Sequence, residues 1–120
     1  MPDNPILDPH AIQALRDLSP EGGAEFLKEL ITIYLKDTPT QMTELEDALA
    51  RQDAARVTRA AHTIKGSSGN FGAAALAQLT LVIEAHGKAG NLTAAAAALP
   101  GFKAEFARVR EALQKLSAGA

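Results

Sequence analysis

The sequence contains no cysteine, no tryptophan and few aromatic residues of any kind. Without cysteine, the chain has no disulfide, no thiolate nucleophile and no zinc site with a cysteine ligand. Aromatic residues make up only 4% of the chain, which argues against an aromatic-lined ligand pocket and a base-stacking surface. Neither charge dominates, since 12 basic residues oppose 14 acidic ones, whereas nucleic-acid-binding proteins usually carry a clustered basic face. We therefore expect no nucleic-acid partner.

Long apolar runs and targeting signals are missing as well. No stretch approaches the ~20 apolar residues that span a bilayer, and the opening MPDNP lacks the basic region and apolar run of a signal peptide. A chain of 120 residues favours one domain, because a single core usually organises about 100–150 residues. These features predict a single intracellular domain over residues 1–120 that does not bind a membrane. We expect it to be cytoplasmic and a monomer.

The residues that are abundant favour helices. The chain has 25 Ala and 15 Leu, against 9 Val and Ile together. Ala and Leu rank highest in helix propensity, whereas β-branched and aromatic residues are preferred in strands. Composition therefore predicts an all-α fold.

In the N-terminal half, capping signals divide the apolar pattern into three predicted helices. A short helix covers residues 9–18, because Asp8 can cap it and Pro9 suits its first turn. A second helix covers residues 24–37 and has a broad apolar stripe. The run Thr-Pro-Thr-Gln at 38–41 fits a cap, a first-turn proline and a capping-box glutamine. A third helix is expected to begin there.

The C-terminal half predicts three further helices. Asp53 can cap a helix that ends within residues 70–72, and the next helix is closed by Gly87. Apolar residues over 92–116 stay in phase across Pro100, which predicts one long helix kinked at the proline.

These elements predict an antiparallel four-helix bundle over about residues 8–116. A short extra helix lies at its N-terminus, the last helix is kinked, and residues 117–120 form a flexible tail.

Three histidines are the first candidates for chemistry. His10, His62 and His86 are not spaced as metal ligands, and the chain has neither a P-loop nor a nucleophile elbow. No enzyme active site of its own is therefore expected. His86 lies in the last turn of its predicted helix, where a partial positive charge interacts favourably with the helix dipole. His10 is expected to be exposed, and neither of these two is assigned a function.

One face of the helix around His62 is more informative. At ~100° per residue, His62 lies about 130° from the apolar side of this helix, so its ring is expected to face solvent. Gly66 and Gly69 lie on the same face, and Lys65 flanks it. A glycine inside a helix costs ~1 kcal/mol relative to Ala, which favours the interpretation that bare backbone is needed for a partner's approach.

Two interpretations stay open on this pattern alone. The face could accept a phosphoryl group from a docked protein, with Lys65 neutralising the charge. Alternatively, it could be a solvated histidine beside a Gly-Ser-Ser-Gly loop.

Residues 61–73, AHTIKGSSGNFGA, resemble the signature of histidine-containing phosphotransfer (HPt) domains. That signature is His-x-(Leu/Ile)-Lys-Gly-(Ser/Ala)-(Ser/Ala), followed by an apolar residue and then Gly-(Ala/Leu), and every defined position matches. The predicted bundle, with its histidine on a central helix, is similar to the family over nearly the whole chain. The resemblance implies a single HPt domain over residues 1–120.

The resemblance also implies a role in a multi-step phosphorelay. His62 would accept a phosphoryl group on Nε2 from the aspartyl phosphate of one receiver domain and pass it to another. Lys65 would neutralise the phosphoryl oxygens, Gly66 would leave clearance for docking, and Thr58 and Gly69 would contact the partner. The receiver would supply Mg²⁺, so the chain would need no cofactor and would have no ATP-dependent kinase activity of its own.

Other functions stay open. The domain could be phosphorylated directly by the ATP-binding domain of a chemotaxis-type histidine kinase, or it could be an interaction bundle that is never phosphorylated. Its expected partners are response-regulator receiver domains, a hybrid histidine kinase, or both. We expect a stand-alone protein, because no kinase or receiver sequence is attached, although a domain cut from a hybrid kinase fits the sequence too.

Overall fold

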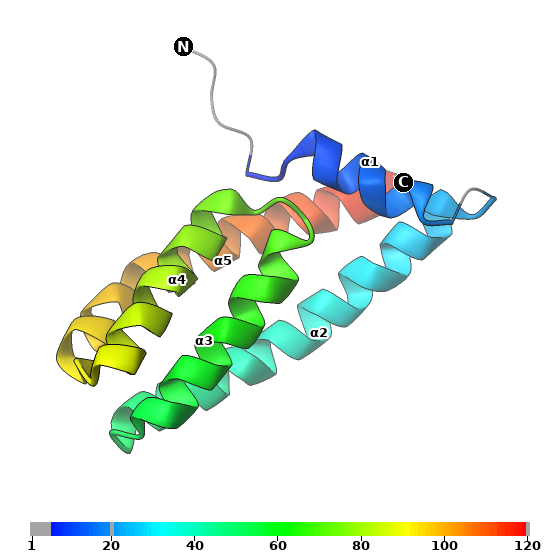
Figure 1. Ribbon diagram of the computed structural model, residues 1–120. Coiled ribbons are helices and arrows are strands. Elements are labelled where there is room, and N and C mark those ends of the chain that lie inside the picture. The colour runs from blue at the N-terminus through cyan, green and yellow to red at the C-terminus, as the bar shows by residue number, and fades with distance from the viewer. Residues whose placement is uncertain (1–5, 20, 120) are drawn as a thin grey trace, which may run out of the picture.

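The computed structural model describes residues 6–19 and 21–119, so the opening MPDNP and Pro20 lie outside it. This described part contains no strand and no helix both long and apolar enough to cross a bilayer. Its helices are α1 (Pro9–Asp17), α2 (Gly23–Ala50), α3 (Ala54–Gly69), α4 (Ala74–Ala89) and α5 (Leu92–Gly119) (Figure 1). The predicted all-α fold is confirmed.

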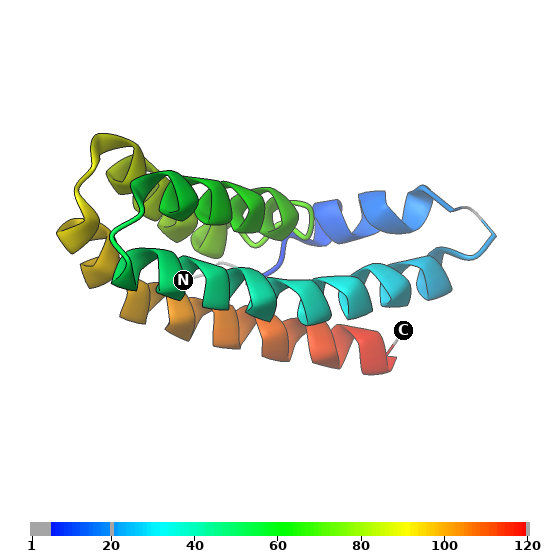
Figure 2. The same ribbon diagram turned by 90° about the horizontal axis from the view of Figure 1, so that it is seen from below.

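The four longer helices form the predicted antiparallel bundle. Each helix from α2 to α5 packs against the next one along the chain, and α2 also contacts α5. Short connections, such as residues 51–53 between α2 and α3, make consecutive helices antiparallel neighbours. Figure 2 shows α3 lying over the second half of α2, while the short α1 lies over its first half. The extra N-terminal helix thus covers a length of α2 that α3 leaves open.

The structure corrects the predicted helix boundary at residues 38–41. α2 is continuous over 28 residues and contains Pro39 in its interior. Thr38, which was expected to be a cap, is buried and only 3% exposed. The buried residues keep helical spacing on both sides of the proline; they are Leu27, Ile31, Tyr34, Thr38, Leu45 and Ala48. Packing of this continuous face outweighs the local cost of a proline in the helix.

The end of α4 also differs from the prediction. The helix continues past Gly87 to Ala89, and Gly90 is its C-cap. Gly90 has a φ of 74°, the left-handed conformation that glycine adopts most readily at this position. Gly87 has no such conformation and lies buried inside the helix.

The last helix is longer than predicted. α5 runs through Pro100 as one helix, as expected, but it continues to Gly119. Residues 117–119 of the predicted flexible tail are therefore helical, and Ala120 lies outside the described residues. The kink at Pro100 stays a prediction.

Gly72 determines how α1 meets the turn between α3 and α4. Its φ of 68° is left-handed, and a Cβ there would clash with Asp8 Cβ. Asp8 N donates a hydrogen bond to Gly72 O at 3.1 Å, and Asp8 Oδ1 caps α1 by accepting from His10 N at 2.9 Å. The turn at the end of the signature motif thus holds the start of α1.

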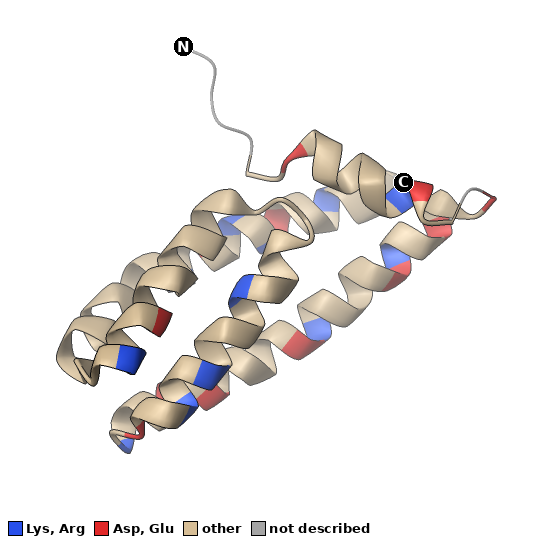
Figure 3. Cartoon of the chain, viewed as in Figure 1, with Lys and Arg blue, Asp and Glu red and all other residues tan. Residues whose placement is uncertain are grey.

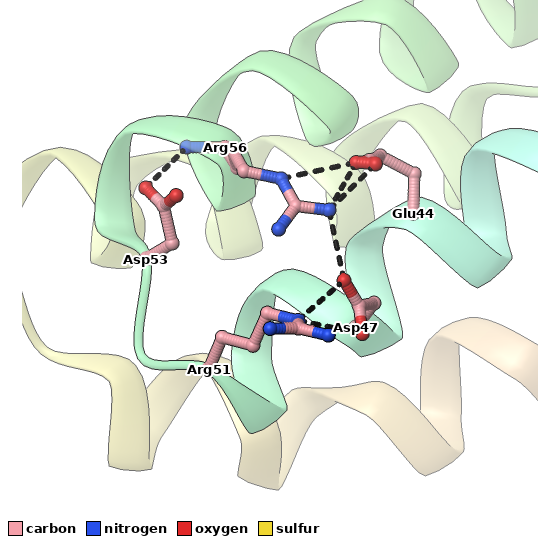
Figure 4. Close-up of polar contacts among 5 residues, drawn as sticks. All are labelled: Glu44, Asp47, Arg51, Asp53 and Arg56. Carbon is pink, nitrogen blue, oxygen red and sulfur yellow. Dashed lines mark hydrogen bonds and ion pairs between the residues drawn. The ribbon is translucent and has the colours of Figure 1, made fainter.

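A cluster of charged side chains aligns the end of α2 with the start of α3 (Figure 4). Arg56 donates to both carboxylate oxygens of Glu44 and to Asp47. Asp47 also accepts from Arg51 at 3.1 Å, and Asp53 caps α3 by accepting from Arg56 N. The hydrogen bonds from Arg56 and then Arg51 hold the pKa of Asp47 below its ordinary value. Each of these partly or fully exposed pairs contributes modestly to stability.

Candidate functional site

His62 lies on the outer side of α3, as predicted. Its side chain is 67% exposed, whereas the opposite side of the same helix is fully packed into the core. The buried residues of α3 are Val57, Ala60, Ala61, Ile64 and Ser68. Helical periodicity therefore places the imidazole where a partner protein can reach it.

The exposed ring is anchored by a buried carboxylate on α4. His62 Nδ1 lies 2.9 Å from Oε2 of Glu84, a residue that is only 3% exposed. Lys65 Nζ donates to the other oxygen, Oε1, at 2.7 Å. Lys88 Nζ lies 3.5 Å from Oε2. Three side chains from two helices thus converge on one carboxylate.

The ionisation state of Glu84 determines which ring nitrogen of His62 carries the proton. The hydrogen bond from Lys65 is the main cause that lowers the pKa of Glu84, and the one from His62 adds to it, while burial opposes both. Glu84 is therefore ionised near neutral pH and only accepts hydrogen bonds. Nδ1 must then be the nitrogen that carries the proton. In the neutral ring this leaves a free electron pair on Nε2, at the far edge of an exposed imidazole.

Glu84 is the site residue that sequence reasoning missed. It lies on the buried side of α4, in register with Thr80 and Gly87. Of Asp, Glu, Lys and Arg, helix α4 contains only Glu84 and Lys88. The rest of its ribbon is therefore tan in Figure 3. A lone carboxylate on an otherwise apolar or small-residue stripe was the available signal, because such a group needs a buried partner.

The remaining predicted site residues lie around this centre. A Cβ at Gly66 or at Gly69 would meet nothing within 4 Å, so both positions leave open space beside the helix. Lys65 is 30% exposed in its side chain and is already bonded to Glu84. Thr58 lies partly buried against α4, with its hydroxyl donating to Ala54 O at 2.8 Å. The roles of these residues in transfer and docking stay predictions.

The other two histidines lie where the sequence predicted. His10 is exposed in the first turn of α1, and His86 is in the last turn of α4. Among the described residues, no group of three or more His, Asp or Glu side chains is arranged to hold a metal ion. That the partner supplies Mg²⁺ stays a prediction.

An apolar groove of about 600 Å³ runs beside the histidine-bearing face. It lies between α1, α2 and α3, and α3 contributes Thr63 and Ser67, the immediate neighbours of His62 and Gly66. Leu18, which is 69% exposed, and Ile33, which is 55% exposed, also line it. The face of α3 that carries His62 thus continues into an apolar surface.

Comparison with known proteins identifies the family. A model of the Hpt domain family matches residues 29–119 of the chain. Among curated proteins, histidine-containing phosphotransfer protein 1 of Arabidopsis thaliana is 27% identical over 113 residues, which cover 92% of this chain and 73% of the plant protein.

Solved structures agree with this match. Histidine-containing phosphotransfer protein B from Pseudomonas aeruginosa is 26% identical, with a TM-score of 0.88 over 98% of this chain and 99% of that one. A histidine-containing phosphotransfer protein from maize is 25% identical, with a TM-score of 0.81 over 92% of this chain and 82% of that one. The chain therefore belongs to the Hpt domain family, whose members carry phosphoryl groups in two-component and phosphorelay signalling.

Proposed function

We propose that this chain is a cytoplasmic phosphorelay carrier that accepts a phosphoryl group on Nε2 of His62 from one receiver domain and passes it to another. The observation that carries the proposal is the hydrogen bond of 2.9 Å between His62 Nδ1 and the buried Glu84. It holds the proton on the inner nitrogen of an exposed ring. A solvated surface histidine with no function needs no such anchor.

The chemistry of the transfer follows from this arrangement. The Nε2 electron pair attacks the phosphorus of the receiver's aspartyl phosphate, a P–N bond forms, and the P–O bond to the aspartate breaks. The carboxylate leaves with the bonding electrons, and the ring becomes a phosphorylated imidazolium that keeps its Nδ1 proton. The adjacent negative charge of Glu84 stabilises that imidazolium. The return reaction, onto a second receiver, reverses these steps.

Lys65 can serve both the carboxylate and the phosphoryl group. An ammonium has three N–H donors, and Glu84 Oε1 takes one of them. Another can bond to a phosphoryl oxygen without releasing Glu84. Phosphoryl transfer depends mainly on positioning and charge neutralisation, so this single cation fits a site whose remaining parts come from the partner. In this proposal the receiver brings Mg²⁺ and the aspartate, and the chain uses no ATP itself.

The surface around His62 favours a receiver domain, or the receiver of a hybrid kinase, as the partner. The bare backbone at Gly66 and Gly69 gives the clearance that an in-line approach to Nε2 requires. Thr58, near the start of the same helix, remains a candidate contact. The apolar groove beside Thr63 offers burial to a docking partner.

The test is transfer from a phosphorylated receiver. Wild-type chain is incubated with a receiver labelled by a small phosphodonor, and His62→Gln is the matched control, because its amide can still donate to Glu84. We expect acid-labile, base-stable phosphate on the wild type, none on His62→Gln, and none on the wild type with Mg²⁺ and ATP alone. Labelling of His62→Gln, or self-labelling with ATP, would overturn the proposal.

A further inference from the structure

Two contacts lie one above the other between α3 and α4. In the first, His62 meets Glu84 at 2.9 Å. In the second, Thr58 meets Gly87. Thr58 precedes His62 by one helical turn, and Gly87 follows Glu84 by about one turn on the antiparallel helix. The distance between α3 and α4 at Thr58 and Gly87 therefore determines how far the Glu84 side chain must extend to contact His62.

Gly87 has no room for a side chain. A Cβ built there would lie 2.7 Å from Thr58 Oγ1, 3.2 Å from Thr58 N and 3.2 Å from Val57 Cγ1. The Thr58 hydroxyl is held in place, since it donates to Ala54 O at 2.8 Å. The backbone of Gly87 has an ordinary helical conformation, because it is not among the residues with positive φ. Glycine is thus required at this position because a side chain would clash, and not because of the backbone conformation.

We infer that Gly87 is a positioning residue for His62: its missing side chain lets α4 approach α3 closely enough for Glu84 to hold Nδ1. The inference rests on the proposed function of His62. Glu84 is buried, and both of its oxygens are engaged, Oε1 by Lys65 and Oε2 by His62. If α4 moves outward, the carboxylate has little freedom to keep its hydrogen bonds to these two residues of α3. Hydrogen bonds of this N–H···O type have donor–acceptor distances of about 2.7–3.2 Å, so the bond of 2.9 Å tolerates only a small outward shift of α4.

Gly101 is a helical glycine that, unlike Gly87, has open space around it. Gly101 on α5 is exposed, and a Cβ there would meet nothing within 4 Å. Gly101→Ala therefore adds the same methyl group to a helix, with the same gain in helix propensity, but without pressing two helices apart. It is the matched control for Gly87→Ala.

The experiment compares wild type, Gly87→Ala and Gly101→Ala by three measurements. These are the ¹⁵N chemical shifts of the His62 ring, the rate of transfer from a phosphorylated receiver, and the melting temperature. In Gly87→Ala we expect the His62 ring to lose its single Nδ1-protonated form and transfer to slow at least about 10-fold, as small misplacements of reacting groups do. Gly101→Ala should match the wild type in ring shifts and transfer.

Two further variants keep the test decisive if Gly87→Ala folds poorly. Glu84→Asp shortens the carboxylate side chain by one methylene and leaves the helix contact alone, so it should cause the same change in the ring shifts. Adding Thr58→Ala to Gly87→Ala removes the contact at 2.7 Å and should restore part of the wild-type spectrum, a coupling expected of touching residues.

The possible outcomes separate this inference from the proposed function. If Gly87→Ala melts at a different temperature but keeps wild-type ring shifts and transfer, Gly87 only packs helices and the inference is wrong. A wild-type ring spectrum in Glu84→Asp would contradict it as well. If the wild type takes no phosphate while Gly87→Ala still alters the ring shifts, the positioning role stands and the proposed function fails.

Discussion

The Tyr34 hydroxyl lies 2.7 Å from Ser68 Oγ in the buried contact between α2 and α3. Burial raises the pKa of Tyr34, and its hydrogen bonds with Ser68 and Thr38 oppose that rise only in part. The phenol is therefore neutral and can donate. Ser68 lies on the opposite side of α3 from His62. This buried polar pair favours one rotation of α3 about its axis, the rotation that turns His62 outward.

We predict that Tyr34→Phe lowers the free energy of unfolding by about 1–3 kcal/mol, because it leaves the buried Ser68 hydroxyl without this partner. Ser68→Ala should have a similar effect, since the Tyr34 hydroxyl then loses its partner. The double variant should be less destabilised than the sum of the two. Urea denaturation of all three variants measures this coupling. Additive losses would show that the two hydroxyls do not act as a pair.

Glu84→Gln should slow transfer to His62 by about 10-fold or more, since a neutral amide cannot stabilise the imidazolium that forms and can donate to Nδ1 instead of accepting from it. Glu105→Gln is the matched control. Glu105 is also buried, only 8% exposed, and is paired with Arg108 at 2.8 Å on α5. Rates are measured with the same phosphorylated receiver. Equal rates for both variants would remove Glu84 from the mechanism.

Glu84 should also contribute to the loss of stability in acid. Its pKa in the folded state is lowered from an ordinary value of 4.5, chiefly by Lys65 and then by His62. The unfolded chain therefore binds the proton first as the pH falls. The contribution of Glu84 to stability is complete above about pH 4.5 and is lost as the pH falls through its folded-state pKa.

The measurement is urea denaturation of wild type and Glu84→Gln between about pH 6 and pH 3. We expect the free energy of unfolding of the wild type to fall more steeply over this range. Asp47, whose pKa is also lowered, is present in both proteins, so the difference between them isolates Glu84. Parallel curves would contradict the prediction.

Gly66 allows docking to be separated from folding. Gly66→Ala should raise the free energy of unfolding by up to ~1 kcal/mol, because Ala is the better helix former and no atom lies within 4 Å of the added Cβ. Gly66→Leu should fold as well, yet its side chain rises one turn from His62 and obstructs the approaching receiver. Thermal melts and transfer rates of both variants test this. If Gly66→Leu transfers at the wild-type rate, Gly66 does not provide clearance for docking. If Gly66→Leu unfolds, Gly66 is needed for helix packing instead.

Local periodicity was sufficient to predict the outward face of α3. The positions of His62, Gly66 and Gly69 relative to the core depend only on the turn of one helix. Glu84 could not be placed in the same way. Its partnership with His62 joins residues 22 positions apart in the sequence, and it depends on how α4 rotates and how closely it approaches α3. A single helix does not contain that information.

The two prolines show the competition between local and tertiary signals. Apolar residues stay in phase across Pro100, which correctly predicts that this proline lies inside a helix. The buried residues around Pro39 keep helical spacing too, but the Thr-Pro-Thr-Gln run at 38–41 fits a helix N-terminus and predicts a boundary that α2 does not have. Thr38 is buried in the core, so packing overrode the local capping preference. The predicted helix end at Gly87 is wrong for a similar reason: this glycine lies inside α4, where Thr58 and Val57 of α3 leave no space for a side chain.

The proposed phosphorylation site is the Nε2 nitrogen of His62. The most direct measurement is NMR of wild-type chain, labelled with ¹⁵N at histidine and phosphorylated by a receiver, in which ³¹P–¹⁵N coupling identifies the bonded nitrogen. We expect one phosphohistidine, with the phosphorus coupled to Nε2 of His62 and the proton retained on Nδ1 beside Glu84. Coupling to Nδ1 of His62, or phosphate on His10 or His86, would contradict it.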